Sequence, residues 1–500
     1  MTSFYPSHGY NLAAMKQLHL TLVFSLLAGL WYTPAQASES DCRRFYAQVE
    51  RAIARAGVRD AQEAPVKAYP YLRSDRFLAS LVQDTDNEAR FDFLLQQLVA
   101  REQRARQLEL RNLPPLARAD LERMQRDIFP GQPYISTTLD NCAKALLAGD
   151  RSHPDAIKRA IRAPDSYSLF KRLLGFYPLT AVPFSSGIRK FQAEMTRTHG
   201  KNLSDVVRDV DVRFHTPQPS AALDVAAILQ QASDNPLRIP LPSSEPLAQL
   251  FAHFAPNFAI DTRADFDRPG ALRWDDDGRP SIDATSATVY TIVSHTKFDG
   301  QTLLQLNYVI WFSERPKKGT FDMLGGALDG LIWRVTLAPD GAPLLYDAIH
   351  PCGCYHVFYP TEKLRAKPRH PSLQEPAYVP QAAPRLGPGE RPTLWLESAT
   401  HYLVRVTDSA LDMTRSAAPY ELADYDQLRS MPQTDGTRRS LFRPDGLIAG
   451  TERGERLLFW PMGIASAGAM RQWGHHATAF VGMRHFDDPD LIEKAFETAN

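Results

Sequence analysis

Apolar residues are spaced differently in the two parts of the chain, and this difference predicts the fold class. Within residues 38–215 they recur at four-residue spacing, as Phe45, Val49 and Ile53 do, which is the period of an amphipathic helix. Polar residues such as Asn87 stand where helices would begin, and prolines and glycines stand where they would end. We therefore expect a helical domain at 38–215.

A strand pattern replaces the helical one from residue 248 onward. Runs such as TSATVYTIVSHTKF and TLLQLNYVIWFSE are rich in β-branched and aromatic residues and are separated by turn signals such as Asp-Gly. A proline-rich loop at 366–392 interrupts the strands, and DDPDLIEKAFE near the end carries the caps of a helix. Residues 248–500 are expected to form a larger, mainly antiparallel β domain with a C-terminal helix. A Pro/Ser-rich connection at 216–247 would join the two domains, so the expected fold class is α+β.

The first 37 residues have the three-part pattern of a secretory leader. Met15 and Lys16 are followed by an apolar run that ends at Leu30, and an Ala-Gln-Ala cleavage site stands directly before Ser38. We interpret 1–37 as leader and signal peptide, with the true start at Met15, and expect a periplasmic or secreted protein. No later stretch is long and apolar enough to span a membrane, so no transmembrane segment is expected after cleavage.

Composition narrows the classes of partner. The chain has 500 residues, which predicts more than one domain, and 44% of them are hydrophobic, as in a globular protein. Its 57 Lys and Arg residues are balanced by 57 Asp and Glu residues. This balance gives no electrostatic reason to expect nucleic acid as a partner, so we expect an unknown envelope partner or substrate.

Four cysteines are present, and export would allow them to oxidise. Cys42 and Cys142 both lie in the helical region, where their pairing would join the first helix to a later one. We predict a Cys42–Cys142 disulfide, and such a bridge typically stabilises a fold by about 2–4 kcal/mol.

The other two cysteines stand in the segment HPCGCYH, residues 350–356. In an extended strand its four donor side chains would face one side: His350, Cys352, Cys354 and His356. Thiolate and imidazole are preferred ligands of zinc, so the segment predicts a metal site. A rise of about 3.3 Å per residue spreads these donors too far for one ion, so His295 and His401 from other strands are candidates to complete it.

Two other interpretations of the same segment stay open. Gly353 would permit a tight turn in which Cys352 and Cys354 form a disulfide instead of binding metal. In the other interpretation one of these thiols is a nucleophile and a histidine is its base.

Several sequence signatures of enzymes are absent: no G-x-S-x-G elbow, H-E-x-x-H helix or Walker A loop is found. The leading hypothesis is an exported, soluble cell-envelope protein with a Cys/His site centred on HPCGCYH. In its sharpest form the protein is a zinc-dependent hydrolase in which Glu314 or Glu397 activates water. The alternative is a non-catalytic envelope binding or scaffold protein with a structural Cys352–Cys354 disulfide. Whether the protein is an enzyme stays open.

Overall fold

The computed structural model describes residues 38–206, 208–368, 374–408 and 417–499. The leader expected at 1–37 and part of the proline-rich loop lie outside these residues. Helices occur mainly between residues 39 and 254, and strands dominate between residues 257 and 498. The α+β fold class is therefore confirmed, while the domain boundaries stay a prediction.

Local sequence signals set the bounds of the helices. Ser38 accepts a hydrogen bond from the backbone N–H of Asp41 at the start of the first helix, and Gly57, at a left-handed φ of 66°, ends it. Asn87 caps the longest helix in the same way as Ser38. The helices up to residue 254 are α1 (Glu39–Ala56), α2 (Arg76–Ser80), α3 (Glu88–Asn112), α4 (Pro115–Ile128), α5 (Ile135–Asp150), α6 (Pro154–Ala160), α7 (Leu169–Leu174), α8 (Tyr177–His199), α9 (Leu203–Val206), α10 (Val225–Ala232) and α11 (Ser244–Phe254).

The N-terminal helices enclose a core of their own. The apolar face of α1, with Phe45, Val49 and Ile53, is fully buried and packs against α4 and α5. The disulfide between Cys42 and Cys142 joins α1 to α5 with their Cα atoms 5.1 Å apart, which confirms the predicted pairing.

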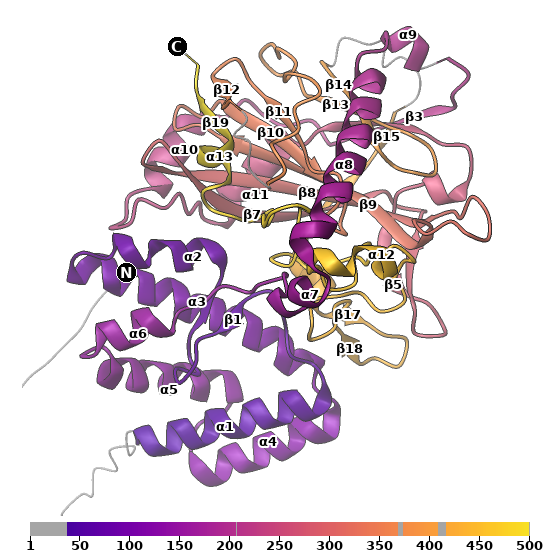
Figure 1. The fold of residues 1–500 in the computed structure, drawn as a ribbon. Coiled ribbons are helices and arrows are strands. Elements are labelled where there is room, and N and C mark those ends of the chain that lie inside the picture. The colour runs from indigo at the N-terminus through magenta and orange to yellow at the C-terminus, as the bar shows by residue number, and fades with distance from the viewer. Residues whose placement is uncertain (1–37, 207, 369–373, 409–416, 500) are drawn as a thin grey trace, which may run out of the picture. The chain divides into compact units, whose positions relative to one another are not determined.

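The larger sheet has six strands in the order β11-β10-β9-β8-β7-β16. Figure 1 labels β7 to β11 of this sheet. Their bounds are β7 (Thr288–Phe298), β8 (Gln301–Arg315), β9 (Gly326–Leu337), β10 (Pro343–Ile349), β11 (Val357–Pro360) and β16 (Glu421–Asp424). Successive strands from β7 to β11 pair antiparallel, and β16 is added parallel to β7. Asp299 and Gly300 close the β7–β8 hairpin with positive φ angles, as an Asp-Gly turn predicts.

A second sheet covers one face of the larger one. Its strands, in the order β14-β13-β4-β3-β15, are β14 (Leu403–Thr407), β13 (Thr393–Leu396), β4 (Asn257–Asp261), β3 (Val212–Thr216) and β15 (Ala418–Pro419). Phe258 and Leu394 from this sheet share a hydrophobic core with Tyr308 and Phe312 of β8. The opposite face of β8 packs against the chain between residues 425 and 486. Both faces of the larger sheet are therefore buried.

Short elements complete the described chain. The remaining strands are β1 (Ala64–Pro65), β2 (Arg73–Ser74), β5 (Ala271–Trp274), β6 (Pro280–Asp283), β12 (Leu364–Ala366), β17 (Met431–Pro432), β18 (Arg438–Arg439) and β19 (Phe496–Thr498). Helix α12 (Arg456–Phe459) is a single turn, and the C-terminal helix α13 (Leu491–Ala495) leads into β19. In the part of the chain that the structure describes, no helix has the length and apolar composition needed to cross a membrane.

Candidate functional site

The HPCGCYH segment forms the tight turn between β10 and β11. The backbone N–H of His350 donates to the carbonyl of Cys354 at 3.0 Å, and Gly353 N–H donates to the carbonyl of His350 at 2.8 Å. Gly353 has a φ of 89°, and a Cβ there would lie 2.6 Å from the carbonyl oxygen of Ala477. Only glycine fits this position, because the turn packs directly on the backbone of the C-terminal segment.

The turn places its two histidines on opposite faces of the larger sheet. Ala348 of β10 pairs with Val357 of β11 in the core shared with the second sheet, so the neighbouring His356 faces the other way. There His356 Nε2 lies 2.8 Å from Asp347 Oδ2. His350 instead packs on Tyr355 and its Nδ1 lies 3.2 Å from Asp329 Oδ1. The structure therefore does not bring the two histidines together.

His401 joins the cluster around His350. Its Nδ1 lies 3.0 Å from Asp329 Oδ2 and its Nε2 lies 3.4 Å from Asp267 Oδ1, so the ring sits between two fully buried carboxylates. Phe312 stacks flat on the ring at 4.0 Å. Burial acts to lower the pKa of His401, but the interactions with the two carboxylates outweigh burial and raise it.

Asp329 is the anion at the centre of this cluster. Burial acts to raise its pKa, but the interactions with His350 and with the Arg453 guanidinium hold it well below the ordinary value. Asp329, Asp267 and Asp347 were not among the residues predicted from sequence. Each aspartate lies on a different strand or segment from the histidine that it contacts. No spacing pattern in the sequence therefore links an aspartate to its histidine.

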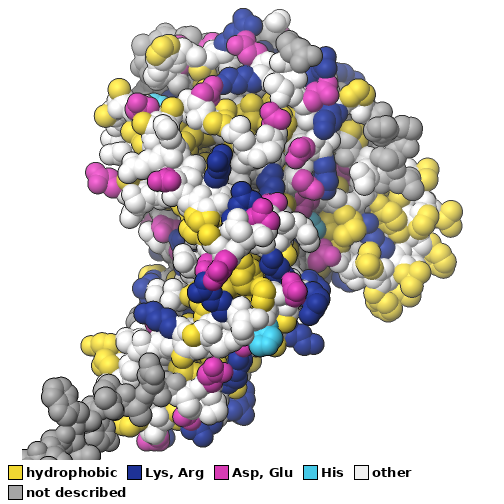
Figure 2. Space-filling model, turned by 90° about the vertical axis from the view of Figure 1, so that its left-hand side faces the viewer, with side chains coloured by type: hydrophobic (Ala, Val, Ile, Leu, Met, Phe, Trp, Pro, Cys, Tyr) yellow, Lys and Arg dark blue, Asp and Glu magenta, His cyan; other side chains and the backbone are white. Residues whose placement is uncertain are grey.

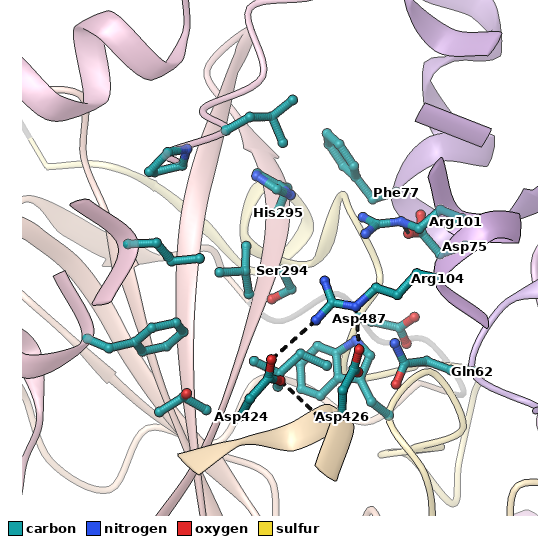
Figure 3. A pocket seen from close by; sticks show the side chains of 18 of the residues that line it. Gln62, Asp75, Phe77, Arg101, Arg104, Ser294, His295, Asp424, Asp426 and Asp487 are labelled. Atoms are coloured by element: carbon teal, nitrogen blue, oxygen red, sulfur yellow. Dashed lines mark hydrogen bonds and ion pairs between the residues drawn. The ribbon is translucent and has the colours of Figure 1, made fainter. Parts of the chain in front are cut away.

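His295, the remaining predicted metal ligand, lies elsewhere on the sheet. Its Nε2–H donates a hydrogen bond of 2.8 Å to the carbonyl of Pro240, and its ring stacks on Phe77. It lines a separate cavity of about 510 Å³ (Figure 3). Charged groups of that cavity form ion pairs, as Figure 3 shows for Arg104 with Asp424 and Asp426.

The two carboxylates predicted from sequence to activate water do not reach these clusters. Glu314 lies near the end of β8 and is exposed. Glu397 is also exposed, and its carboxylate accepts a 2.5 Å hydrogen bond from Thr400. Neither residue lines the cavity that contains His295 or the cavity beside the HPCGCYH turn.

The positions of the predicted ligands can be compared with what a zinc site requires. Among the described residues, no group of three or more His, Cys, Asp or Glu side chains is arranged to hold a metal ion. His350 and His356 each have one ring nitrogen engaged by an aspartate, and the two rings face opposite ways. Zinc binding therefore stays a prediction from the sequence, and no step below passes through a metal.

Cys352 and Cys354 are free, buried thiols that share a hydrogen bond. Donation from Cys354 lowers the pKa of Cys352, with the charge of Arg453 acting in the same direction. The same hydrogen bond and burial raise the pKa of Cys354. The pair therefore ionises at Cys352, and the Cys352–Cys354 disulfide stays a prediction for the oxidised protein.

The turn forms one wall of a cavity of about 510 Å³, which we call the α8 cavity. Cys354, Tyr355 and His356 line this wall, and α8 contributes apolar side chains opposite, among them Phe184 and Phe191. An apolar cavity with a few polar groups is the usual form of a small-molecule site.

Two carboxyl groups with raised pKa values also line the α8 cavity. Burial raises the pKa of Glu455 and outweighs the opposing charge of Arg453. Gly468, at a φ of 82°, leaves room for this carboxyl, because a Cβ there would overlap Glu455 Oε1. Burial also raises the pKa of Glu375, whose carboxylate accepts from the backbone N–H groups of Phe480 and Val481. Neither Glu455 nor Glu375 stands in a motif that would have predicted this position from the sequence.

Aromatic groups connect the cavity wall to the buried cluster. The rings of Tyr355 and Tyr402 lie 4.6 Å apart, and both side chains line the α8 cavity. Arg315 donates to the Tyr402 hydroxyl at 3.2 Å, and the His350 ring lies 5.0 Å from Tyr355. The cluster around Asp329 therefore supports the wall rather than facing the cavity.

Comparison of the chain with protein-family models, with curated proteins and with solved structures finds no match. The function is therefore argued from the geometry of the α8 cavity.

Proposed function

We propose that the protein is an exported cell-envelope hydrolase that cleaves esters of apolar acyl groups in the α8 cavity. One observation carries this proposal. Cys354 of an ionisable thiol pair and Glu455, a carboxyl group with a raised pKa, line the same apolar cavity. The pKa of Cys352, which shares a hydrogen bond with Cys354, is lowered, whereas that of Glu455 is raised. Groups whose environments shift their pKa values in opposite directions are typical of acid–base sites.

Export is supported by two independent features. Disulfides such as Cys42–Cys142 persist mainly outside the cytosol. The leader pattern at 1–37 lies outside the described residues but predicts the same route. We accordingly place the protein in the periplasm or the secreted fraction.

The thiol pair would supply the nucleophile. Cys354 Sγ adds to the ester carbonyl carbon while its proton passes along the existing hydrogen bond to the Cys352 thiolate. Glu455 donates its proton to the leaving oxygen as the carbon–oxygen bond breaks, which releases the alcohol and leaves an acyl group on Cys354.

Water completes the cycle. The Glu455 carboxylate takes a proton from a water molecule as that water adds to the thioester carbonyl. The carbon–sulfur bond then breaks, the carboxylic acid leaves, and the Cys352 proton returns to Cys354. Both thiols and Glu455 regain their starting protonation states.

Hydrolysis of p-nitrophenyl esters of increasing acyl length tests the proposal. Because the cavity wall is apolar, kcat/KM should rise from acetate to octanoate, and Cys354→Ser and Glu455→Gln should each reduce it at least about 100-fold. Glu314→Gln is the matched control, because this exposed carboxylate lies outside the cavity. Equal rates for the Cys354→Ser variant and the wild type would refute the proposal.

A specific observation favours a second candidate, a non-catalytic envelope binding or scaffold protein. His350, His356 and His401 are all buried and each is hydrogen-bonded to an aspartate, as core histidines are. In that case the α8 cavity would bind an apolar ligand without turnover. A fluorescent fatty acid that binds stoichiometrically, in a protein that cleaves none of the esters, would favour this candidate.

A further inference from the structure

Exposed hydrophobic side chains are concentrated at one place on the surface. Of the fifteen large hydrophobic residues exposed in the described chain, ten belong to two short segments around α7 and α12. We call this set the apolar rim: Leu169, Phe170, Leu173, Leu174, Phe176, Leu179, Val182, Leu457, Leu458 and Trp460. Figure 2 shows hydrophobic side chains gathered at the right-hand edge of the molecule. So large a group on one surface indicates an interaction site.

The two segments of the apolar rim are joined by hydrogen bonds. Ser168 N–H donates to the carbonyl of Gly463 at 2.8 Å, and Arg172 Nε donates to the carbonyl of Met462 at 2.9 Å. The rim is therefore one surface built from two distant parts of the sequence.

Helix α7 has the reverse of the usual polarity. Its leucine and phenylalanine side chains point to solvent, with Leu173 75% exposed, whereas Arg172 is buried. The Arg172 guanidinium lies over the rings of Tyr167 and Tyr177 at 4.8 and 4.3 Å. A helix in water normally buries its apolar residues and exposes its charges, so the apolar face of α7 is arranged to contact another apolar phase.

The charged residues of the first segment of the apolar rim are all basic. Residues 166–193 contain no Asp or Glu but four basic residues, of which Arg189 and Lys190 are exposed. Arg456 is also exposed, next to Leu457. Apolar side chains edged by cations match the surface of an anionic phospholipid bilayer, where acyl chains lie beneath phosphate groups.

The apolar rim continues into the α8 cavity. Phe459 lines the cavity and lies between Leu458 and Trp460 of the rim in the sequence. Its ring lies 5.3 Å from that of Phe184, which is two residues beyond Val182. We propose that the apolar rim docks the protein on the surface of an anionic phospholipid bilayer. Docking stands independently of the hydrolase proposal, because it requires none of the reactive groups in the cavity.

Vesicle flotation with the mature protein tests the docking. The protein should float with vesicles of equimolar phosphatidylglycerol and phosphatidylcholine, less with pure phosphatidylcholine, and less again as salt is raised. Leu173→Ser and Leu179→Ser should each weaken binding about tenfold, because each removes one inserted leucine. Leu116→Ser is the matched control, since Leu116 is 83% exposed on α4 and outside the rim.

Two outcomes would overturn the docking. One is a wild-type protein that does not float, and the other is equal binding by the Leu173→Ser and Leu116→Ser variants. A dimer in solution that Leu173→Ser dissociates, without vesicle binding, would instead assign the rim to a contact between two copies. Hydrolysis of a short, water-soluble ester by the same variants separates the two proposals, because loss of docking leaves this rate unchanged.

Discussion

Asp267 and His401 meet in a fully buried contact, with Asp267 Oδ1 3.4 Å from His401 Nε2. The other nitrogen of the His401 ring contacts Asp329, so the histidine lies between two carboxylates, which raise its pKa. Removal of one partner from such a group leaves an uncompensated buried charge.

Replacement of Asp267 should therefore destabilise the fold. We expect Asp267→Asn to lower the free energy of unfolding by about 3 kcal/mol, measured by urea denaturation. Asp265→Asn is the matched control: this side chain is 97% exposed two residues away, and its replacement should change stability by less than about 0.5 kcal/mol. Equal effects of the two substitutions would contradict the role given to the buried contact.

The same cluster predicts how stability depends on pH. The pKa of His401 is raised on folding, so its contribution is fully present below the unfolded value of about 6.5 and is lost as pH rises through the folded pKa. The pKa of Asp329 is lowered, so its contribution is present above 3.8 and is lost as pH falls below that value. The urea midpoint should therefore fall as pH drops below 3.8 and also as pH rises above 6.5. The variant His401→Gln should show a smaller fall on the alkaline side. A midpoint that rises with pH above 6.5 would oppose this assignment.

Chemical reduction should distinguish the disulfide-bonded cysteines, Cys42 and Cys142, from the free thiols of Cys352 and Cys354. The Cys42–Cys142 bridge closes a loop with a sequence separation of 100, so its loss should cost about 4 kcal/mol of unfolding free energy. Thiol titration of the denatured, unreduced protein should find two free thiols, those of Cys352 and Cys354. The double variant Cys42→Ser/Cys142→Ser gives the stability comparison without reductant. A titration with no free thiol would show that the second pair is also oxidised.

Local patterns in the sequence predicted much of the fold. The four-residue spacing of Phe45, Val49 and Ile53 is a local property of one helix, and the Asp299-Gly300 turn is set by its own two residues. The Cys42–Cys142 pairing could be predicted because the chain has only four cysteines, so few other pairings were possible. These features depend on residues close in sequence or on simple elimination.

The site was predicted only in part, for a physical reason. HPCGCYH was singled out as a metal or disulfide segment, and part of it lines the α8 cavity. The pairing of β10 with β11 around its turn decides that His350 and His356 face opposite ways. Asp329 and Glu455 reach the site from distant parts of the chain, and their pKa values depend on burial. One sequence contains no signal for burial at such positions, since Asp and Glu are usually exposed.

The proposed acid predicts the shape of the pH–rate profile. The rate of ester hydrolysis should rise as the Cys352 thiol ionises, below its ordinary pKa of 9.0. It should fall as Glu455 loses its proton, above its ordinary pKa of 4.5. In Glu455→Gln the residual activity should lose the descending limb and keep the ascending one. A descending limb that survives this substitution would assign the acid to another group.

Intact-mass spectrometry of the acid-quenched reaction with p-nitrophenyl octanoate tests the central claim most directly. The account predicts a mass increase of one octanoyl group, located on Cys354 after digestion and absent from the Cys354→Ser variant. An enzyme that turns over the ester without this adduct, or an adduct that persists in Cys354→Ser, would contradict the proposed thiol chemistry in the α8 cavity.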